Sequence, residues 1–389
     1  MRTTLFLISL FYFFTFLSTA TLEEEHSLTT VMREIEVDYH LFEDTNYTDL
    51  PLDEKVSSAP CSLAVPGLSS VGLMITYITV SVLSVIGNSV VIFVICSMEK
   101  SKTSTDIYLM QLAVADLLFA LTLPFWAVYV YSQWIFGTFL CKLLSGLQET
   151  SFYGGVFLLA CISVDRYLAI VKATRALPQR RQMVWLVCGV VWMASALLSL
   201  PVVLQREAMM LEDQGDQMLC YESLTVESGN RWRVCVRVLR HTLGFFVPLG
   251  VMVVCYGGTA GTLFRARNGQ KHKAMRVIMA VVFAFVLCWL PYNVSVLLDT
   301  LIRGQSLGGV TCSLWSRVEL SLNVTQVMAF MHCALNPVLY AFVGQKFRNQ
   351  LLVALYKHGM LSQKAMIAYR RGSANSSGSL RSRNTFVTV

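Results

Sequence analysis

The apolar residues of this chain gather in long uninterrupted blocks, and this pattern limits the fold more than any other feature of the sequence. Each block is about 20 residues long or more, the length that an α-helix needs to cross the hydrocarbon core of a bilayer. Only 14% of the residues are charged, whereas a soluble domain carries about a quarter. The sequence therefore predicts an all-α membrane protein, a seven-transmembrane helix bundle at residues 69–343. The predicted spans are residues 71–96, 107–131, 143–164, 183–204, 242–263, 277–298 and 320–343.

A shorter apolar run opens the chain, at residues 5–17. Arg2 precedes it and small residues follow it. A positive start, a short apolar stretch and a small-residue end are typical of a cleavable signal peptide, which we place at residues 1–20. The alternative is an uncleaved signal anchor.

Charge is divided between the two sides of the predicted membrane. Basic loops around Lys100 and Lys102, at 172–181 and at 265–276, together with the tail from Lys346, alternate with neutral or acidic loops. Because Lys and Arg are enriched in cytoplasmic loops, the amino terminus is predicted outside and the carboxyl terminus inside. The formal net charge of +7 therefore reflects the basic cytoplasmic loops. We do not take it as a sign of a nucleic-acid partner.

The segment between the signal peptide and the first span, residues 21–68, is strongly acidic. Its Asp and Glu residues are opposed only by Arg33 and Lys55. Such a segment is too polar to fold alone, so we expect a disordered extracellular arm. Its charge would steer a basic partner toward the membrane surface; the alternative is an arm that only aids solubility. Asn46 heads an Asn-X-Thr glycosylation sequon in this arm.

The cysteines separate into two groups. Seven of the 11 lie in or beside predicted spans, and we expect most of them to be small packing residues. The other four fall on the outer, oxidising side, where two disulfides are expected. They are Cys61, Cys141, Cys220 and Cys312. Four cysteines allow three connectivities, and the residues alone leave all three open.

Polar residues and prolines inside the spans are candidate functional positions. Asp116 lies in the middle of a span, where a carboxylate is costly and is functional by default; the alternative is a hydrogen-bonded structural hub. Prolines interrupt five spans, at Pro124, Pro201, Pro248, Pro291 and Pro337. Proline removes a backbone hydrogen bond and kinks a helix. Inert bends are common in membrane helices, but five kinked spans favour hinges between two packings.

Three short motifs lie at the ends or kinks of spans. Asp165-Arg166-Tyr167 follows the third block and precedes a basic loop. The sixth block contains Cys288-Trp289-Leu290-Pro291, and the seventh contains Asn336-Pro337-Val338-Leu339-Tyr340. Each motif is modest alone, but their order and their placement in successive spans are specific.

With these motifs in these spans, the chain resembles the class A, rhodopsin-like G-protein-coupled receptors and, more narrowly, the CXC chemokine receptors of the interleukin-8 receptor subgroup. Further matching features are Thr122-Leu123-Pro124 and Trp134. The stretches that carry the narrower resemblance are LLFALTLPFW at 117–126, WIFGTFLCK at 134–142, ACISVDRYLAIVKA at 160–173, GQKHKAMRVI at 269–278 and LCWLPYN at 287–293.

The resemblance implies a receptor of the plasma membrane for CXC chemokines that carry a Glu-Leu-Arg triplet. It implies coupling to an inhibitory-class G protein, calcium mobilisation and leukocyte chemotaxis. A non-signalling chemokine scavenger receptor is the alternative, although scavengers often have an altered Asp-Arg-Tyr motif. A retinal-binding photoreceptor would need a lysine within 320–343, and the sequence has none there. We find no transporter-like repeat of broken helices and no catalytic pair, so neither a transporter nor an enzyme is predicted.

The resemblance also implies roles for individual residues. It pairs Cys141 with Cys220 and Cys61 with Cys312. It implies that Arg166 contacts the G protein when the cytoplasmic face opens and that Asp165 restrains it when the face is closed. The other residues implied in activation are Asp116, Tyr167, Tyr256, Trp289, Pro291, Asn336, Pro337 and Tyr340. Gly155 and His332 stand where sodium-binding members supply polar ligands, so we expect no sodium ion at Asp116.

On the ligand side, the resemblance implies sulfation of tyrosines among the acids Asp38, Glu43 and Asp44, which suits a basic chemokine. Tyr39 is the favoured site, because a glycan on Asn46 would compete with sulfation of Tyr47. Unmodified tyrosines are the alternative. The implied ligand-contacting residues of the spans are Trp126, Arg233, Arg237, Asp299, Arg303 and Gln326. The two arginines of the fifth span would pair with the Glu of the triplet and Asp299 with its Arg. Interfacial anchoring is the alternative for the arginines, and Gln326 replaces a glutamate that is usual in the subgroup.

The cytoplasmic end is predicted in two parts. Residues 344–358 alternate basic and apolar residues at helical spacing, which is typical of an amphipathic helix on membrane lipid. Residues 359–389 form a Ser/Thr-rich tail that is expected to be disordered and to be phosphorylated by receptor kinases for arrestin capture. The predicted phosphorylation sites are Ser373, Ser376, Ser377, Ser379, Ser382, Thr385 and Thr388. The terminal residues 387–389 could add as a strand to a PDZ domain.

Overall fold

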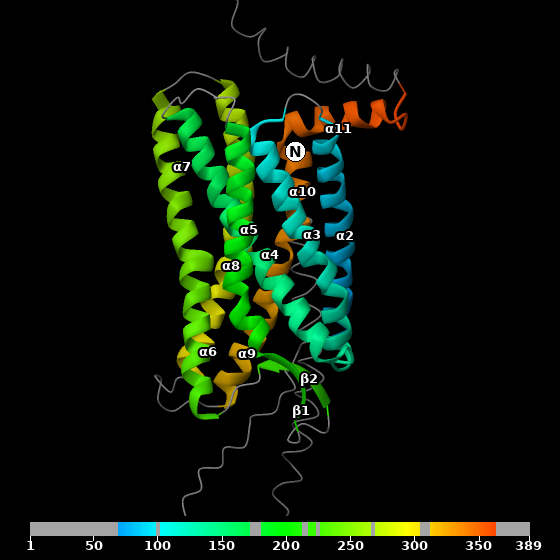
Figure 1. Ribbon diagram of the computed structural model, residues 1–389, viewed down its shortest axis with the longest axis vertical. Helices are drawn as coiled ribbons and strands as arrows, with labels where there is room; N and C mark the ends of the chain where they lie inside the picture. The colour runs from blue at the N-terminus through cyan, green and yellow to red at the C-terminus, as the bar shows by residue number, and fades with distance from the viewer. Residues whose placement is uncertain are drawn as a thin grey trace, which may run out of the picture. The chain divides into compact units, whose positions relative to one another are not determined.

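A computed structural model describes residues 69–98, 102–171, 180–211, 217–222, 226–265, 269–303 and 312–362. The predicted signal peptide, the acidic arm and the tail from 363 onward lie outside these residues. The described chain is almost entirely helical. Its elements, in order, are α2 (Ser70–Cys96), α3 (Ser104–Tyr131), α4 (Gly137–Ile170), α5 (Arg180–Gln205), β1 (Arg206–Leu211), β2 (Gln217–Glu222), α6 (Val226–His241), the π-helical turn η2 (Thr242–Phe246), α7 (Val247–Arg265), α8 (Gly269–Arg303), α9 (Cys312–Phe330), α10 (His332–Val343) and α11 (Gln345–Lys357) (Figure 1).

Six helical segments of the described residues are long and apolar enough to cross a membrane, and each overlaps one of the first six predicted blocks, although the fifth begins eight residues before its block. They are Ser70–Cys96, Ser104–Tyr131, Gly137–Ile170, Gln182–Gln205, Val234–Thr262 and Ile278–Ile302. The third is longer than the predicted block 143–164. The apolar pattern stops at Lys142 and at Asp165, but helical hydrogen bonding continues through these polar residues.

The predicted seventh block, 320–343, does not form one helix. It is divided between α9 and α10 at Met331, whose carbonyl accepts both from the Ala334 amide, in a tight three-residue turn, and from the Leu335 amide, each at 3.1 Å. This tight turn interrupts the regular α-helical pattern. α9 also begins at Cys312, earlier than the block, because its first turns carry polar residues such as Arg317 that the hydropathy pattern excludes.

The described residues fall into two compact units: the first takes its described residues from the ranges Met1–Thr76 and Cys288–Ala329, and the second from Tyr77–Leu287 and Phe330–Val389. In the first unit, the hydroxyl oxygens of Ser295 on α8 and Ser321 on α9 lie 2.8 Å apart. The Thr325 hydroxyl donates to the Ser321 carbonyl at 2.6 Å, and its oxygen lies 3.3 Å from that of Ser295. These polar contacts join α8 to α9 within that unit.

The second unit carries an antiparallel hairpin that an all-α prediction misses. β1 and β2 pair with Ala208 opposite Cys220 and Met210 opposite Met218. The Trp134 amide donates to the Met218 carbonyl at 2.9 Å, and the Met218 amide donates to Gln133 Oε1 at 3.2 Å. The strands are too short to give a clear alternating pattern in the sequence, so their pairing depends on these contacts and on the disulfide at Cys220.

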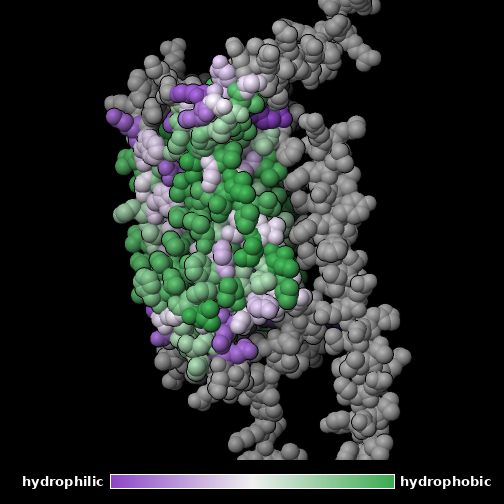
Figure 2. Space-filling view, turned by 90° about the vertical axis from the view of Figure 1, so that its right-hand side faces the viewer, coloured by the Kyte–Doolittle hydropathy of each residue, from purple (hydrophilic) through white to green (hydrophobic). Residues whose placement is uncertain are grey.

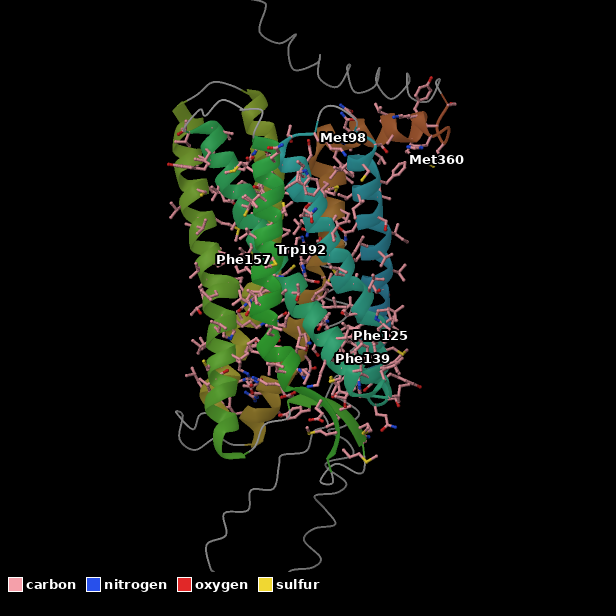
Figure 3. All side chains as sticks on the ribbon, viewed as in Figure 1. Met98, Phe125, Phe139, Phe157, Trp192 and Met360 are labelled. Atoms are coloured by element: carbon pink, nitrogen blue, oxygen red, sulfur yellow. A yellow bond between two sulfur atoms is a disulfide. The ribbon has the colours of Figure 1, made fainter. Side chains whose placement is uncertain are left out.

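The hairpin and α11 lie at opposite ends of the helices of the second unit (Figure 1). Phe125 and Phe139 are seen at the hairpin end, and Met98 and Met360 at the α11 end (Figure 3). This is the separation that the predicted topology requires, with residues 206–222 outside and residues 345–357 inside. The predicted helix at 344–358 is confirmed as α11; its Phe347 ring lies 6.2 Å from the Tyr340 ring.

Large apolar side chains are exposed along the helices instead of being confined to an interior. Met193 on α5 is 68% exposed and Val254 on α7 is 72% exposed. Figure 2 shows hydrophobic residues covering the middle of the visible face, with hydrophilic residues toward its ends. Contiguous apolar surface of this kind is not stable in water, so it is expected to face lipid.

Candidate functional site

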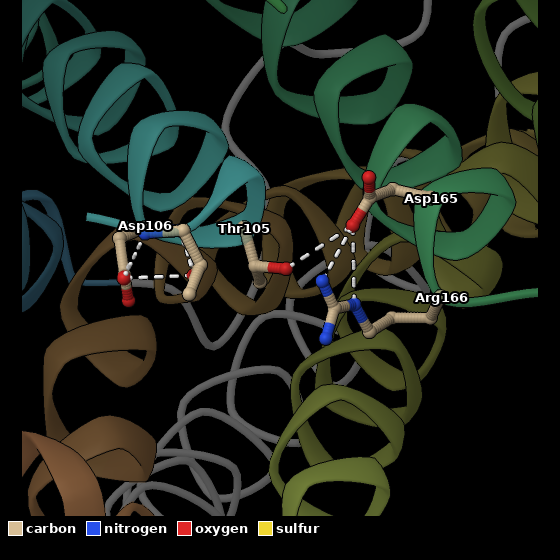
Figure 4. A network of polar contacts seen from close by, with 5 residues as sticks. Thr105, Asp106, Asp165 and Arg166 are labelled. Atoms are coloured by element: carbon tan, nitrogen blue, oxygen red, sulfur yellow. Dashed lines mark hydrogen bonds and ion pairs between the residues drawn. The ribbon is translucent and has the colours of Figure 1, made fainter. Parts of the chain in front are cut away.

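The Asp-Arg-Tyr motif lies at the end of α4 in a compact polar network (Figure 4). Arg166 donates to Asp165 Oδ2 from Nη2 at 2.6 Å and from Nε at 3.2 Å. The Thr105 hydroxyl of α3 donates to the same oxygen at 3.3 Å. Asp165 is buried, while Arg166 is partly exposed. The contact expected between Asp165 and Arg166 is therefore present, and it restrains the guanidinium.

Thr105 reaches Asp165 because of the way α3 begins. Thr103 and Asp106 form a capping box, in which the Asp106 carboxylate accepts from the Thr103 amide at 2.7 Å and the Asp106 amide donates to the Thr103 hydroxyl at 3.3 Å. This reciprocal pattern fixes the first turn of the helix. The sequence-based prediction missed Thr105, although the Thr-X-X-Asp spacing marks the start of the helix that positions it.

Tyr256 of α7 and Tyr167 of the motif both pack between α4 and α7. The Tyr256 hydroxyl lies 2.9 Å from the Ser163 hydroxyl, which also donates to the Leu159 carbonyl at 2.7 Å. A Cβ atom at Gly258 would lie only 2.7 Å from the Tyr167 ring. The glycine thus provides the space that the ring occupies.

Asp116 lies at the centre of the second unit and is 2% exposed. Asn336 Nδ2 donates to its Oδ2 at 2.8 Å, and His332 Nε2 lies 3.6 Å from its Oδ1. Both oxygens thus face residues of α10. The geometry joins two predicted activation residues, Asp116 and Asn336, and places His332 beside the same carboxylate.

Gly87 and Asn88 of α2 contact α10 at Pro337 and at the carbonyl that this proline leaves without a helical donor. Pro337 has no amide hydrogen, so it leaves the carbonyl four residues back, at Cys333, without its usual helical donor. Asn88 Nδ2 donates to that carbonyl at 2.9 Å. A Cβ atom at Gly87 would lie 2.8 Å from the Pro337 ring. Tyr340, one turn further, is buried, and its hydroxyl has no hydrogen-bond partner among the described residues.

The first unit contains the motif of the sixth span and three of the predicted ligand residues, two of which, Asp299 and Gln326, have described side chains. Trp289 is 1% exposed, and its ring lies 6.0 Å from that of Tyr292. Asn293 Nδ2 donates to the Trp289 carbonyl at 2.8 Å, which supports the backbone beside Pro291. Asp299 is 3% exposed, so this predicted rim charge is buried, whereas Gln326 is half-buried.

At the hairpin end of the second unit, Cys141 and Cys220 form a disulfide with a Cα–Cα distance of 5.7 Å. This confirms one of the two implied pairings. Beside it, Trp134 is fully buried, and its ring lies 5.3 Å from that of Trp126 and 5.2 Å from that of Phe136. Trp126 Nε1 is buried without a hydrogen-bond partner among the described residues.

Many of the remaining predicted positions lie outside the described residues. Arg237 lies half-buried on α6, but the side chains of Arg233, Arg303 and Cys312 fall outside the part that the structure describes. So do the predicted residues of the arm, Asp38, Tyr39, Glu43, Asp44, Asn46, Tyr47 and Cys61. The same holds for the predicted phosphorylation sites Ser373, Ser376, Ser377, Ser379, Ser382, Thr385 and Thr388.

One ion pair near the hairpin end was not predicted as a site. Arg240 Nη2 of α6 lies 3.2 Å from Glu149 Oε1 of α4. In the sequence, Arg240 reads only as additional positive charge beside Arg237, and Glu149 belongs to none of the recognised motifs. An acidic residue inside the predicted third block, away from both of its ends, is a signal that could have found it.

Comparison with known proteins agrees with these features. Residues 87–340 match the family described as 7 transmembrane receptor (rhodopsin family). The chain is 48% identical over 337 residues to C-X-C chemokine receptor type 1 of Homo sapiens, which is 86% of this chain and 95% of that relative. It is 48% identical over 311 residues to C-X-C chemokine receptor type 2 of Homo sapiens, 80% of this chain and 85% of the relative. The type 2 receptor of Oryctolagus cuniculus is 46% identical over 344 residues, 88% of this chain and 93% of the relative.

Proposed function

Because this chain belongs to the rhodopsin family of seven-transmembrane receptors and, within it, to the C-X-C chemokine receptors, we propose that it is a cell-surface receptor that signals in response to CXC chemokines. The observation that carries this proposal is the 48% identity to a C-X-C chemokine receptor over 86% of the chain. The family has the seven-transmembrane fold that the apolar blocks predict.

The proposed ligand is a basic CXC chemokine with a Glu-Leu-Arg triplet. The acidic arm attracts its body by long-range electrostatics, and sulfate on Tyr39 strengthens that attraction. The outer ends of the spans receive its amino terminus, with positive charge from Arg237 on α6 and an indole donor at Trp126 that has no partner among the described residues. Arg233, Arg303, Asp299 and Gln326 complete the proposed ligand-contacting set.

The proposed output is activation of an inhibitory-class G protein, followed by calcium mobilisation and leukocyte chemotaxis. The Asp165–Arg166 contact of 2.6 Å supports a signalling receptor, because an intact, restrained arginine is what a cytoplasmic switch requires. This contact argues against the non-signalling scavenger. We further propose a plasma-membrane location with the amino terminus outside, lipid contact along α11, phosphorylation of the tail by receptor kinases, arrestin capture and a PDZ partner at the carboxyl terminus.

A calcium-mobilisation panel in transfected cells tests this function. Purified CXC chemokines with and without the triplet are applied to cells whose surface receptor is measured with an antibody to an arm epitope. We expect responses to triplet-bearing chemokines, and their loss after treatment with an inhibitor of inhibitory-class G proteins. Saturable chemokine binding and uptake with no calcium response would instead establish the scavenger, and the absence of binding to any CXC chemokine would refute the proposal.

A further inference from the structure

Arg240, in the apolar helical segment Val234–Thr262, and Glu149, in the segment Gly137–Ile170, form an ion pair close to the hairpin end. Arg240 Nη2 lies 3.2 Å from Glu149 Oε1. The guanidinium carbon also lies 5.0 Å from the centre of the Phe152 ring, one turn further along α4. Arg240 is thus held by a carboxylate and by an aromatic face. Both of these partners come from α4, whereas the arginine comes from α6.

The pair is only partly satisfied. The Arg240 side chain is 24% exposed and that of Glu149 is 12% exposed, so the guanidinium is reachable while the carboxylate is nearly covered. Among the described residues, Glu149 Oε2 and Gln148 Nε2 are buried and make no hydrogen bond. Buried polar atoms normally have a partner. The Glu149 carboxylate therefore pairs with the arginine through Oε1, while Oε2 stays without a partner among the described residues.

The helix around Arg240 changes its geometry at the same place. α6 ends at His241, and the π-helical turn η2 follows at Thr242–Phe246. Single π-helical turns within α-helices are frequent at functional sites. Within η2, a Cβ atom at Gly244 would lie 2.8 Å from the Phe152 ring and 2.9 Å from the Tyr153 ring. The backbone of η2 is thus packed directly on α4, whereas one turn earlier α6 is connected to α4 through the ion pair.

From this arrangement we propose that Arg240 is an anion-recognition residue and that Glu149 is its built-in competitor. In the receptor without ligand, the Glu149 carboxylate is paired with the Arg240 guanidinium. When the ligand binds, one of its own carboxylates displaces Glu149 and pairs with Arg240. The proposal rests on the proposed function and deepens it, because it assigns the acid of the Glu-Leu-Arg triplet to a particular arginine.

The position of Arg240 suits this role. It lies three residues after Arg237, on the same face of α6. An acidic group that meets Arg237 near the end of the span can therefore pass one turn deeper to Arg240. The exchange of one carboxylate for another leaves the arginine paired throughout, and the cost of losing a partner falls on the displaced Glu149 carboxylate.

An internal competitor has a consequence that a structural ion pair lacks. While Glu149 holds the arginine, only a fraction of receptors can accept the ligand acid, and the apparent affinity is reduced by that fraction. Neutralising Glu149 should therefore tighten binding, whereas neutralising Arg240 should weaken it. If the pair only fastened α6 to α4, both substitutions would act in the same direction.

The experiment measures equilibrium binding of a triplet-bearing CXC chemokine to membranes of cells that express the full-length receptor. A second probe is the same chemokine with the triplet Glu replaced by Gln. With the first probe we expect Glu149→Gln to tighten binding by about threefold to tenfold and Arg240→Gln to weaken it by about tenfold or more. The double variant should behave like Arg240→Gln. With the second probe, all three variants should differ little from the wild type.

Two further variants serve as controls. Glu207→Gln neutralises an exposed acid of β1 and should not tighten binding, so it controls for a general change of charge. Arg240→Lys keeps the charge without the planar fork and should retain part of the affinity. Surface amounts of every variant are measured with an antibody to an arm epitope, so that loss of folded receptor is separated from loss of affinity.

The outcomes separate the inference from the function on which it rests. A wild-type receptor that binds neither probe refutes the proposed function and this inference with it. If the wild type binds, but Glu149→Gln and Arg240→Gln shift affinity in the same direction, the competitor role is wrong. Equal effects on the two probes would also overturn it, since the triplet Glu would then not be the group that Arg240 recognises.

Discussion

The Asp165 carboxylate gathers three donors on one oxygen, two from the Arg166 guanidinium and one from the Thr105 hydroxyl. Hydrogen bonds to a charged group are stronger than neutral ones. The arginine is nevertheless partly exposed, and its ion pair is with the residue next to it in the chain. The guanidinium is therefore more accessible to a partner than the carboxylate that holds it.

Replacement of Arg166 by Ala should separate ligand capture from signalling. We expect chemokine affinity to be retained, because Arg166 lies at the opposite end of α4 from the disulfide. Ligand-stimulated nucleotide exchange on an inhibitory-class G protein should fall by about 5- to 150-fold, the range that a coupling free energy of about 1–3 kcal/mol spans. Binding and exchange are measured on the same membranes. Normal exchange in the variant would rule out the role given to Arg166.

A second prediction concerns the mid-membrane carboxylate. Asn336 donates to one oxygen of Asp116 at 2.8 Å and His332 faces the other at 3.6 Å. A sodium ion would have to displace these side chains from a buried site, which is unfavourable. Agonist affinity should therefore be the same in sodium chloride and in choline chloride at equal ionic strength. A specific loss of agonist affinity in sodium would contradict this expectation.

Among the elements, the contact of α2 with α10 depends on a glycine and an asparagine. Gly87 admits the Pro337 ring, and Asn88 supplies the donor that the proline removes from the helix. The kink of α10 is thus fixed from outside α10. Bends whose freed backbone groups are satisfied by a neighbouring helix are characteristic of membrane proteins.

A matched pair of glycine variants tests this contact. Gly87→Ala places a methyl group 2.8 Å from the Pro337 ring, whereas Gly189→Ala, on α5, has no atom within 4 Å of the new methyl group. Overpacking should lower the stability of the first variant by about 1–3 kcal/mol. The second should be neutral or stabilising by up to about 1 kcal/mol, because Ala favours a helix over Gly. Thermal unfolding in detergent compares them, and equal stability of the two would show that the close approach is not required.

At the scale of the whole molecule, the observed disulfide and the predicted one are expected to have different structural roles. Cys141–Cys220 lies within the described structure and closes a sequence separation of 79 residues. It holds the hairpin against α4, next to the buried Trp134. The predicted Cys61–Cys312 pair would instead tether the acidic arm to the start of α9.

Removal of the two disulfides should therefore have different effects. Cys141→Ala should reduce the amount of folded receptor at the cell surface, because loss of a native disulfide costs about 2–5 kcal/mol. Cys61→Ala should leave surface amounts intact but weaken chemokine binding, since the arm is no longer held in place. Surface immunostaining and ligand binding are measured for each variant. Undiminished chemokine binding by Cys61→Ala would refute the tether.

The sequence predicted the first six spans because bilayer thickness imposes one length on every helix that crosses it. It placed the ends of the third span and the start of the fifth wrongly, since polar residues such as Lys142, Asp165 and Arg240 interrupt the apolar pattern without ending the helix. The break at Met331 had no signal, because methionine is an ordinary helix-forming residue. The local hydropathy pattern thus predicts which segments lie in the membrane, but it does not predict at which residue a helix ends.

The polar partners were harder to predict than the motifs. Thr105 and Asp165 are 60 residues apart in the chain, and Ser163 and Tyr256 are 93 apart. Nothing in the local sequence distinguishes Thr105 or Ser163 from other small polar residues of a span. Their roles follow only from the packing of one helix on another, which a single sequence does not encode in a local pattern.

The β1–β2 hairpin has a consequence for how any extended peptide can be recognised. A strand with a free edge accepts another strand through main-chain hydrogen bonds, largely regardless of side chains. At Met218 that edge is already taken by Trp134 and Gln133, and at Ala208 the amide donates to the Thr138 hydroxyl at 3.4 Å. At these positions the sheet cannot be extended. A peptide that arrives there must be recognised by its side chains, so its amino-acid identity matters and not merely its extended form.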